Sequence, residues 1–288
     1  MKRAQFVAAL ACCLCLGMAH PAAAQDSGPR TYAMMSLIGD SVSILPFNSA
    51  ITRNVIGMRD ASRLDQQQHL SVQLNTPGFD QIALGSVAAA LRQSLPGATI
   101  DVLQTRDASL YRLQDRLFES PEATRDTREA LKATLREHNA NYLVIVTRRR
   151  TQRGFLPSDA HLLPDANLQM YTARAGGPQN SAYEKLEGIG FYVDESQRVQ
   201  NVKTLDISNG ILVSYIVATM RLVDAKTLAQ VAEVPVFQQK VIAVSRPQEV
   251  GFNAWDEATE QQKIRSLEEV IELGLTDATH RLLGAAAR

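Results

Sequence analysis

The sequence has little cysteine, no excess of charge and no long apolar run after its first residues. Its three cysteines (Cys12, Cys13 and Cys15) lie near the N-terminus, so the chain from Gln25 onward contains none. This excludes disulfides, thiolate catalysis and cysteine metal sites from that part. Thirty basic residues balance thirty acidic ones, which argues against nucleic acid as a partner. No later stretch is apolar for long enough to span a bilayer.

The first 24 residues have the composition of an export signal. Lys2 and Arg3 precede an apolar stretch over residues 6–18, and three alanines at 22–24 precede Gln25. This order of charged, apolar and small residues is typical of a cleaved secretory signal. We therefore expect residues 1–24 to be removed near Ala24/Gln25 and the product to be periplasmic or secreted.

The product is expected to be soluble and at most peripheral to a membrane. A lipoprotein signal usually carries leucine three positions before its cysteine, but Ala9 stands there relative to Cys12. Without Lys2 and Arg3, 28 basic residues remain against 30 acidic ones, a formal charge of −2. Residues 25–288 suit one domain, interrupted at about residues 151–187 by an irregular loop rich in Gly and Pro.

Hydrophobic periodicity predicts an α/β (α+β) fold with a mixed sheet. Gly39-Asp40, between two short apolar runs, suits a type II′ turn and predicts an N-terminal hairpin. Two βα crossovers, a long C-terminal hairpin around Asp224 and a final long helix follow. Pro235 indicates an edge position or a bulge in that hairpin. Expected strands are 34–38, 42–47, 69–74, 98–103, 142–146, 188–194 and the hairpin 211–244; expected helices are 80–95, 121–138 capped by Ser120, and 257–283 capped by Asp256.

One alternative function is suggested by short motifs at the two ends of the chain. "IGDS" ends at Ser41, and "TDATH" places Asp277 and His280 in an Asp-x-x-His spacing. This pair resembles the GDSL/SGNH hydrolases. The resemblance implies a serine esterase with Ser41 as nucleophile, His280 as general base and Asp277 as its orienting acid.

Three features oppose the esterase interpretation. The residues after Ser41, "SVSILPF", alternate as a strand, whereas the family follows its serine with a loop and a helix. "GGPQN" at residues 176–180 does not match the family's oxyanion motif, Gly-x-Asn-Asp. Helical periodicity places Asp277 and His280 opposite the apolar face of the final helix. We therefore favour no catalytic residue.

Arginines gather where an apolar strand ends, in "NYLVIVTRRRTQR". Arg148, Arg149, Arg150 and Arg153 are candidates to bind the phosphate or carboxylate of a lipid headgroup or a cell-wall polymer. The alternative is a charged strand end that enters solvent. Asp159, His161 and Asp165 match no standard ligand spacing, so no metal and no cofactor is expected.

The order of elements, with "NYLVIVTRRR" and "YIVATMRLVDAKTLAQVAEV", resembles a module of bacterial envelope proteins. Examples are the N-terminal domain of the Tol-Pal translocation protein, the curli-secretion lipoprotein and the lipoprotein activators of penicillin-binding proteins. The resemblance implies a non-catalytic protein that binds another periplasmic or outer-membrane component. A periplasmic carrier of a small ligand, with a pocket under the long loop, is a further alternative.

Overall fold

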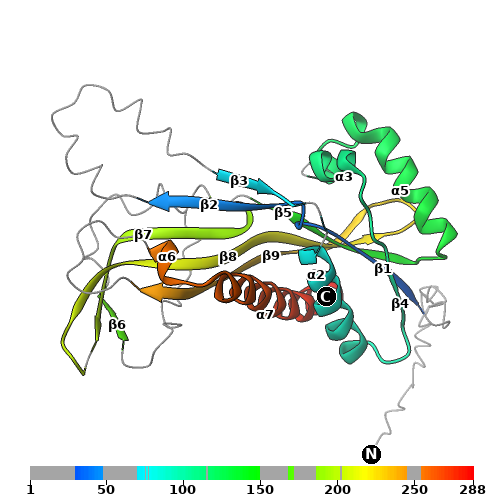
Figure 1. The fold of residues 1–288 in the computed structure, drawn as a ribbon. Coiled ribbons are helices and arrows are strands. Elements are labelled where there is room, and N and C mark those ends of the chain that lie inside the picture. Colours follow the sequence, from blue (N-terminus) through cyan, green and yellow to red (C-terminus); the bar gives the residue numbers. More distant parts are fainter. Residues whose placement is uncertain are drawn as a thin grey trace, which may run out of the picture.

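One mixed sheet of nine strands organises the molecule (Figure 1). The structure is a computed structural model, and it describes residues 30–47, 70–74, 76, 78–114, 116–149, 168–171, 186–201, 203–244 and 254–288. The strands are β1 (Thr31–Leu37), β2 (Ser41–Phe47), β3 (Leu70–Gln73), β4 (Thr99–Val102), β5 (Tyr142–Arg148), β6 (Leu168–Tyr171), β7 (Gly188–Asn201), β8 (Ile207–Asp224) and β9 (Gln230–Val244). Parallel and antiparallel pairs coexist, so the predicted α/β class with a mixed sheet is confirmed.

The predicted N-terminal hairpin is wrong, because β1 and β2 do not pair with each other. β1 lies between β4 and β5 and is parallel to both. β2 lies between β3, which is antiparallel to it, and β7, which is parallel. The pairings of β5 and β7 with β8 show that β1 and β2 run in the same direction. Ile38, Gly39 and Asp40 are therefore a break between two collinear strands.

The long strand β8 carries β5 and β7 end to end on one side. Arg148, the last residue of β5, pairs with Ala218, and Gly188, the first residue of β7, pairs with the adjacent Val217. β1 pairs with β5 and β2 pairs with β7, so β1 and β2 also lie end to end, in the next row of the sheet. The break after Ile38 thus lies beside the junction of β5 and β7.

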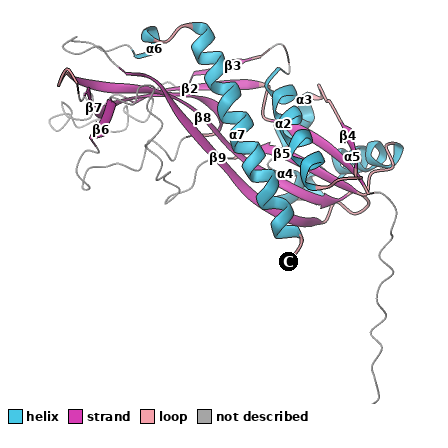
Figure 2. Cartoon of the chain, turned by 90° about the horizontal axis from the view of Figure 1, so that it is seen from below, coloured by secondary structure: helices cyan, strands magenta, loops and turns pink. Residues whose placement is uncertain are grey.

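Helices cover both faces of the sheet. α2 (Gly78–Ser94) and α7 (Glu260–Ala286) lie together on one face (Figure 2). The short α3 (Ala108–Leu113), α4 (Arg116–Glu119) and η2 (Glu122–Thr124), together with α5 (Arg125–Glu137), pack on the other. Alternation along β1 serves both layers, because Met34 joins the core under α2 and Met35 joins the core under α5.

The C-terminal hairpin and the edge position of Pro235 are confirmed. β8 and β9 are antiparallel, and Pro235 faces Thr219. Among the described strands β9 pairs with β8 alone, so its outer side has no ladder for proline to interrupt. Asp224 holds the turn, since its Oδ1 accepts hydrogen bonds from the backbone N–H groups of Lys226 and Thr227.

Two predicted helix starts need correction. A 3-10 turn precedes α5, whose N-cap is Thr124 and not Ser120. The final helix is capped by Thr259, because a separate short helix, α6 (Ala254–Glu257), contains Asp256. Thr259 and Gln262 form a reciprocal capping box, a stronger start signal than a lone aspartate.

Within the predicted irregular segment at 151–187, the described residues Leu168–Tyr171 form the strand β6. β6 pairs with the distal part of β7, which continues to Asn201 and not only to Asp194. Among the described residues, no helix is both long and apolar enough to cross a membrane.

Candidate functional site

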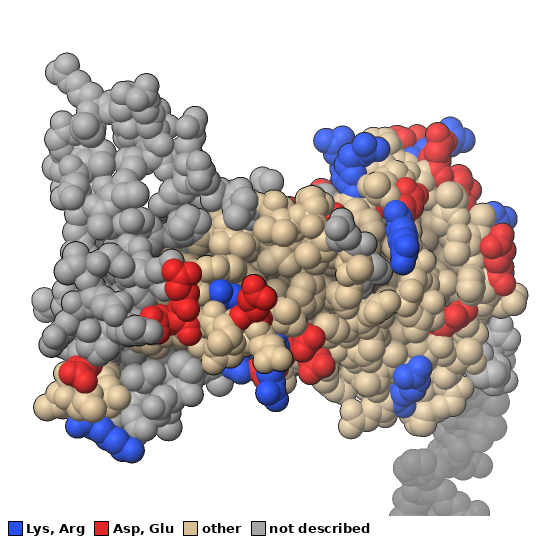
Figure 3. All heavy atoms as spheres, in the orientation of Figure 1, with Lys and Arg blue, Asp and Glu red and all other residues tan. Residues whose placement is uncertain are grey.

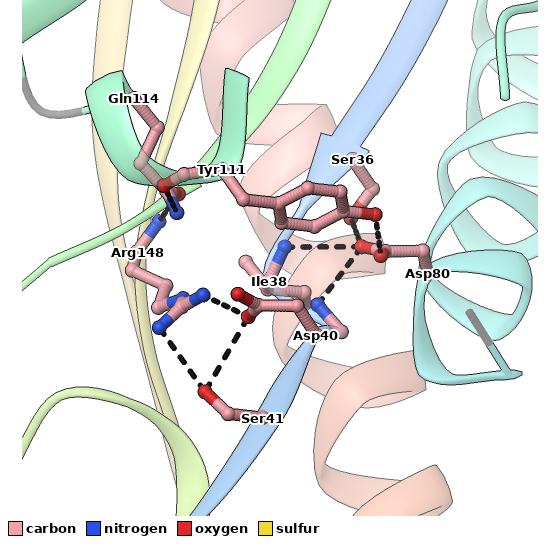
Figure 4. Close-up of polar contacts among 9 residues, drawn as sticks. Ser36, Ile38, Asp40, Ser41, Asp80, Tyr111, Gln114 and Arg148 are labelled. Atoms are coloured by element: carbon pink, nitrogen blue, oxygen red, sulfur yellow. Dashed lines mark hydrogen bonds and ion pairs between the residues drawn. The ribbon is translucent and has the colours of Figure 1, made fainter. Parts of the chain in front are cut away.

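A buried carboxylate holds the break between β1 and β2. Asp80, in the first turn of α2, is 4% exposed. Its Oδ1 accepts hydrogen bonds from the backbone N–H groups of Ile38 and Gly39, each at 3.0 Å, and from Ser36 Oγ at 2.6 Å. Its Oδ2 accepts from the Tyr111 hydroxyl at 2.6 Å (Figure 4). One side chain thus satisfies the donors that the broken strand leaves unpaired.

Burial sets the acid–base character of this pair. Desolvation raises the pKa of Asp80, although the hydrogen bonds from Ser36, Tyr111, Ile38 and Gly39 oppose it. The pKa of Tyr111 is also raised, first by burial and then by its hydrogen bond to Asp80. Tyr111 therefore stays protonated and donates to Asp80.

Gly39 is required by the close approach of α2 to the break. A Cβ at this position would lie 2.6 Å from the backbone nitrogen of Asp80 and 2.8 Å from its carboxyl carbon. Real Cβ contacts are not this short, and the nearest atom is backbone. Glycine here has a packing role that differs from the predicted turn role.

Arg148 lies on the other side of the break. Its guanidinium forms an ion pair with Asp40 and donates to Ser41 Oγ at 3.1 Å. Its backbone N–H donates to Gln114 Oε1 at 2.7 Å, and Gln114 Nε2 donates to the carbonyl of Tyr111 at 2.7 Å. Figure 4 shows the chain of contacts that joins Arg148 to Asp80 through α3. The break, β5 and α3 therefore form one polar assembly.

Burial lowers the pKa of Arg148, whereas the charge of Glu187 raises it. The buried Nε of Arg148 has no hydrogen-bond partner within the described part of the chain. The arginine stays protonated, because a guanidinium remains charged in proteins. It acts here as a positioned cation that fixes Asp40 and Ser41.

A polar hollow of about 490 Å³ opens at this assembly. It lies beside the carboxyl ends of the parallel strands β1, β4 and β5, the edge at which open α/β sheets bind ligands. Its volume suits a small ligand. Its lining consists of Gly39, Asp40, Gln73, Leu74, Thr76, Thr105, Arg106, Ala108, Tyr111, Arg112, Gln114, Arg148 and Glu187.

The structure does not assemble Ser41, His280 and Asp277 into a triad. Ser41 is 6% exposed and hydrogen-bonds to Arg148 and Asp40. His280 Nδ1 contacts Ser94 Oγ at 3.2 Å, and Asp277 pairs with Arg281 at 2.8 Å.

The length of α2 separates the serine from the histidine. Ser41 follows the break that Asp80 holds at the start of α2, whereas Ser94 is the last residue of that helix. Fourteen residues of helix at about 1.5 Å each separate these ends by about 21 Å. Proton transfer needs hydrogen-bond reach, so His280 cannot serve Ser41 as a base.

The predicted arginine cluster is described only in part. Arg148 belongs to the hollow, and Arg149 is half-buried next to it. Arg150 and Arg153 lie outside the described residues, as do Asp159, His161 and Asp165. Within the described part of the chain, no group of three His, Cys, Asp or Glu side chains is arranged to hold a metal.

Sequence reasoning missed most of the residues around the hollow. Asp80 was placed only as the first residue of a helix, and Tyr111, Gln114, Arg106 and Arg112 were not singled out. One available signal was position: Arg106 follows the predicted strand at 98–103. In parallel sheets the residues after such strands gather at one edge.

Comparisons with known proteins place the chain in no family. No family model matches it, and no curated protein matches its sequence. Among solved structures, it is similar to a single-residue variant of the PelC dodecamer from Paraburkholderia phytofirmans, with 9% identity, 88% of each chain covered and a TM-score of 0.25. A second PelC dodecamer from the same organism has 9% identity and a TM-score of 0.23, over 90% of this chain and 87% of that one.

Proposed function

We propose that the protein is an exported, non-catalytic component of the bacterial cell envelope that binds another envelope component at the hollow beside the β1–β2 break. The observation that carries the proposal is the construction of this hollow. Tyr111, Gln114 and Arg148 of its lining are joined by hydrogen bonds, and the buried Asp80 holds Tyr111 from behind. A wall fixed in this way suits recognition, because little ordering is required on binding.

The chemistry of the wall supports binding over catalysis. Ser41 Oγ accepts a hydrogen bond from the Arg148 guanidinium at 3.1 Å and donates to Asp40 Oδ1 at 3.4 Å. A nucleophile needs a base that accepts its proton, but the same Asp40 oxygen is already held in an ion pair with Arg148. The export signal expected at residues 1–24 accounts for the envelope location.

A second candidate function is a periplasmic carrier of a small ligand. The observation that favours it is the volume of the hollow, about 490 Å³, which lies in the range of small-molecule sites. The two functions differ in whether the occupant is free or part of a larger component.

Photo-crosslinking in cells tests the main proposal. A benzophenone amino acid at Thr76, an exposed residue of the hollow's lining, is compared with one at Arg92, exposed in the last turn of α2. Each substitution is made separately in the full-length gene, so that the expected export signal is kept. We expect a discrete adduct from position 76 that position 92 does not give. Equal adducts from both positions, or none from either, would overturn the proposal.

A serine probe tests the esterase alternative. We expect no labelling of the purified protein by a fluorophosphonate, because the Asp40 carboxylate that accepts from Ser41 is already paired with Arg148. Labelling of the wild type that disappears in Ser41→Ala would establish Ser41 as a nucleophile and contradict a non-catalytic function.

A further inference from the structure

Two arginines of the hollow form no ion pair with the described residues. Arg106 follows β4, Arg112 lies on α3, and both are exposed and line the hollow. The side chain of neither arginine forms a hydrogen bond or an ion pair with the rest of the described chain. The acid near Arg112 is Asp107, whose pKa is lowered first by hydrogen bonds from Ser109 and to a smaller extent by Arg112. Asp107 caps α3 through Ser109 and forms no ion pair.

The acidic groups of the lining interact with Arg148. Asp40 pairs with Arg148, and Glu187 acts on the same arginine by raising its pKa. Both carboxylates of the lining therefore interact with Arg148 electrostatically. The wall formed by Arg106 and Arg112 remains cationic, and like charges in one hollow repel unless an anion lies between them.

Neutral hydrogen-bond donors complete this side of the hollow. The hydroxyl groups of Thr76 and Thr105 and the amide of Gln73 belong to the same lining. Guanidinium groups bind carboxylate and phosphate oxygens in a bidentate manner, and hydroxyl and amide donors satisfy the remaining oxygens. The residue types therefore suit an anion that bears several oxygens.

We propose that the hollow binds a carboxylate or phosphate group between Arg106 and Arg112, with Arg148 as the fixed cation behind them. This inference rests on the proposed function, because it names the chemical group through which the bound component is recognised. It moves the anion site from the predicted Arg148–Arg153 run to Arg106, in the loop after β4, and Arg112, on α3, which line the same hollow as Arg148.

Calorimetric titration of the purified, exported protein tests the site. The probes are inorganic phosphate, citrate, and vesicles of phosphatidylglycerol against vesicles of phosphatidylcholine. Arg106→Gln/Arg112→Gln is compared with Arg92→Gln/Arg265→Gln, which also removes two exposed positive charges but on α2 and α7. A matched thermal melt of both variants confirms folding.

At least one anionic probe is expected to bind the wild type. The Arg106/Arg112 variant should weaken that binding by about tenfold or more, because it removes two charged donors that pair with the anion. The control variant should keep wild-type affinity. Binding of phosphate or citrate identifies a soluble anion, whereas binding of phosphatidylglycerol vesicles alone identifies a lipid headgroup.

The inference is overturned if no anionic probe binds, or if both double variants lose the same affinity. The two proposals fail separately. A position-76 adduct without anion binding would support the binding of an envelope component but contradict its recognition through an anionic group. Anion binding without an adduct would support the anion site and favour the small-ligand carrier.

Discussion

Two short polar stretches, at Gly39-Asp40 and at Asp224–Thr227, were both expected to be hairpin turns, and only the second is one. The second stretch is held by its own residues. Asp224 Oδ1 accepts from Lys226 N, Thr227 N and Thr227 Oγ1, and Leu228 takes a left-handed conformation with φ of 55°. Every partner lies within a few residues, so sequence alone determines the turn.

The first stretch is held by a residue far away in the chain. In a hairpin, the N–H groups of Ile38 and Gly39 would find acceptors close to the turn. Here both donate to Asp80, about forty residues further along the chain. The β1–β2 break therefore depends on tertiary structure. The difference predicts that substitutions at the break cost more stability than substitutions at the C-terminal turn.

The largest effect is expected for Asp80→Ala, which leaves four buried donors without an acceptor. Each orphaned group costs about 1–3 kcal/mol, partly offset by relaxation, so we expect the free energy of unfolding to fall by about 4 kcal/mol. Urea denaturation measures it. Asp126→Ala, at an exposed position of α5, is the control and should change stability by less than about 0.5 kcal/mol. A loss below about 1 kcal/mol for Asp80→Ala would contradict a tertiary break.

Gly39→Ala is expected to be the next most damaging change. Its Cβ would meet the backbone nitrogen of Asp80 at 2.6 Å, and overpacking of this kind costs about 1–3 kcal/mol. Gly85→Ala is the matched control, because no atom lies within 4 Å of a Cβ there and the position is in α2. The control should gain about 0.5–1 kcal/mol. If both alanines stabilised the protein, the close approach would be refuted.

Asp224→Ala should cost less, about 1 kcal/mol, as the loss of an exposed capping side chain does. The pairing of β8 with β9 continues over both strands, so the hairpin is expected to keep its register. Lys226→Ala, which leaves the hydrogen bonds of Asp224 intact, should be nearly neutral. Denaturation midpoints of the two variants measure the difference, and a cost equal to that of Asp80→Ala would remove the distinction between the two turns.

The smallest effect is a pH dependence at the break. Burial raises the pKa of Asp80 above its ordinary 3.8, so the folded protein keeps this proton at pH values where the unfolded chain has released it. The contribution of Asp80 to stability is therefore greatest below about pH 4 and falls as the pH rises through the folded pKa. The difference in unfolding free energy between the wild type and Asp80→Asn should be larger at pH 4 than at pH 7. The opposite trend would show that the four donors outweigh burial.

The sequence was sufficient for elements whose signals are local. The hairpin of β8 and β9, the helix α2 and the buried strand β5 follow from periodicity and turn residues, and Pro235 correctly indicated an edge. Local signals were ambiguous at Asp256, where Thr259 with Gln262 formed the stronger cap. Such competition between neighbouring caps decides where a helix begins.

The candidate site could not be predicted in the same way. Asp80, Tyr111 and Arg148 come from α2, α3 and β5, and Gln114 follows α3. Their partners lie between 3 and 108 residues away along the chain. Contacts of this range depend on which strands become neighbours. The same limitation applies to Ser41 and His280, whose separation is set by the course of α2.

The end-to-end arrangement of β5 and β7 makes the chain between them an insertion into a single sheet row. Arg148 and Gly188 pair with adjacent residues of β8. The register of β5 and β7 on β8 therefore does not depend on the length of the chain between them. The entropic cost of a longer excursion grows only slowly with its length. Insertions or deletions on either side of β6, which pairs with β7, are therefore expected to leave β5 and β7 in place along β8.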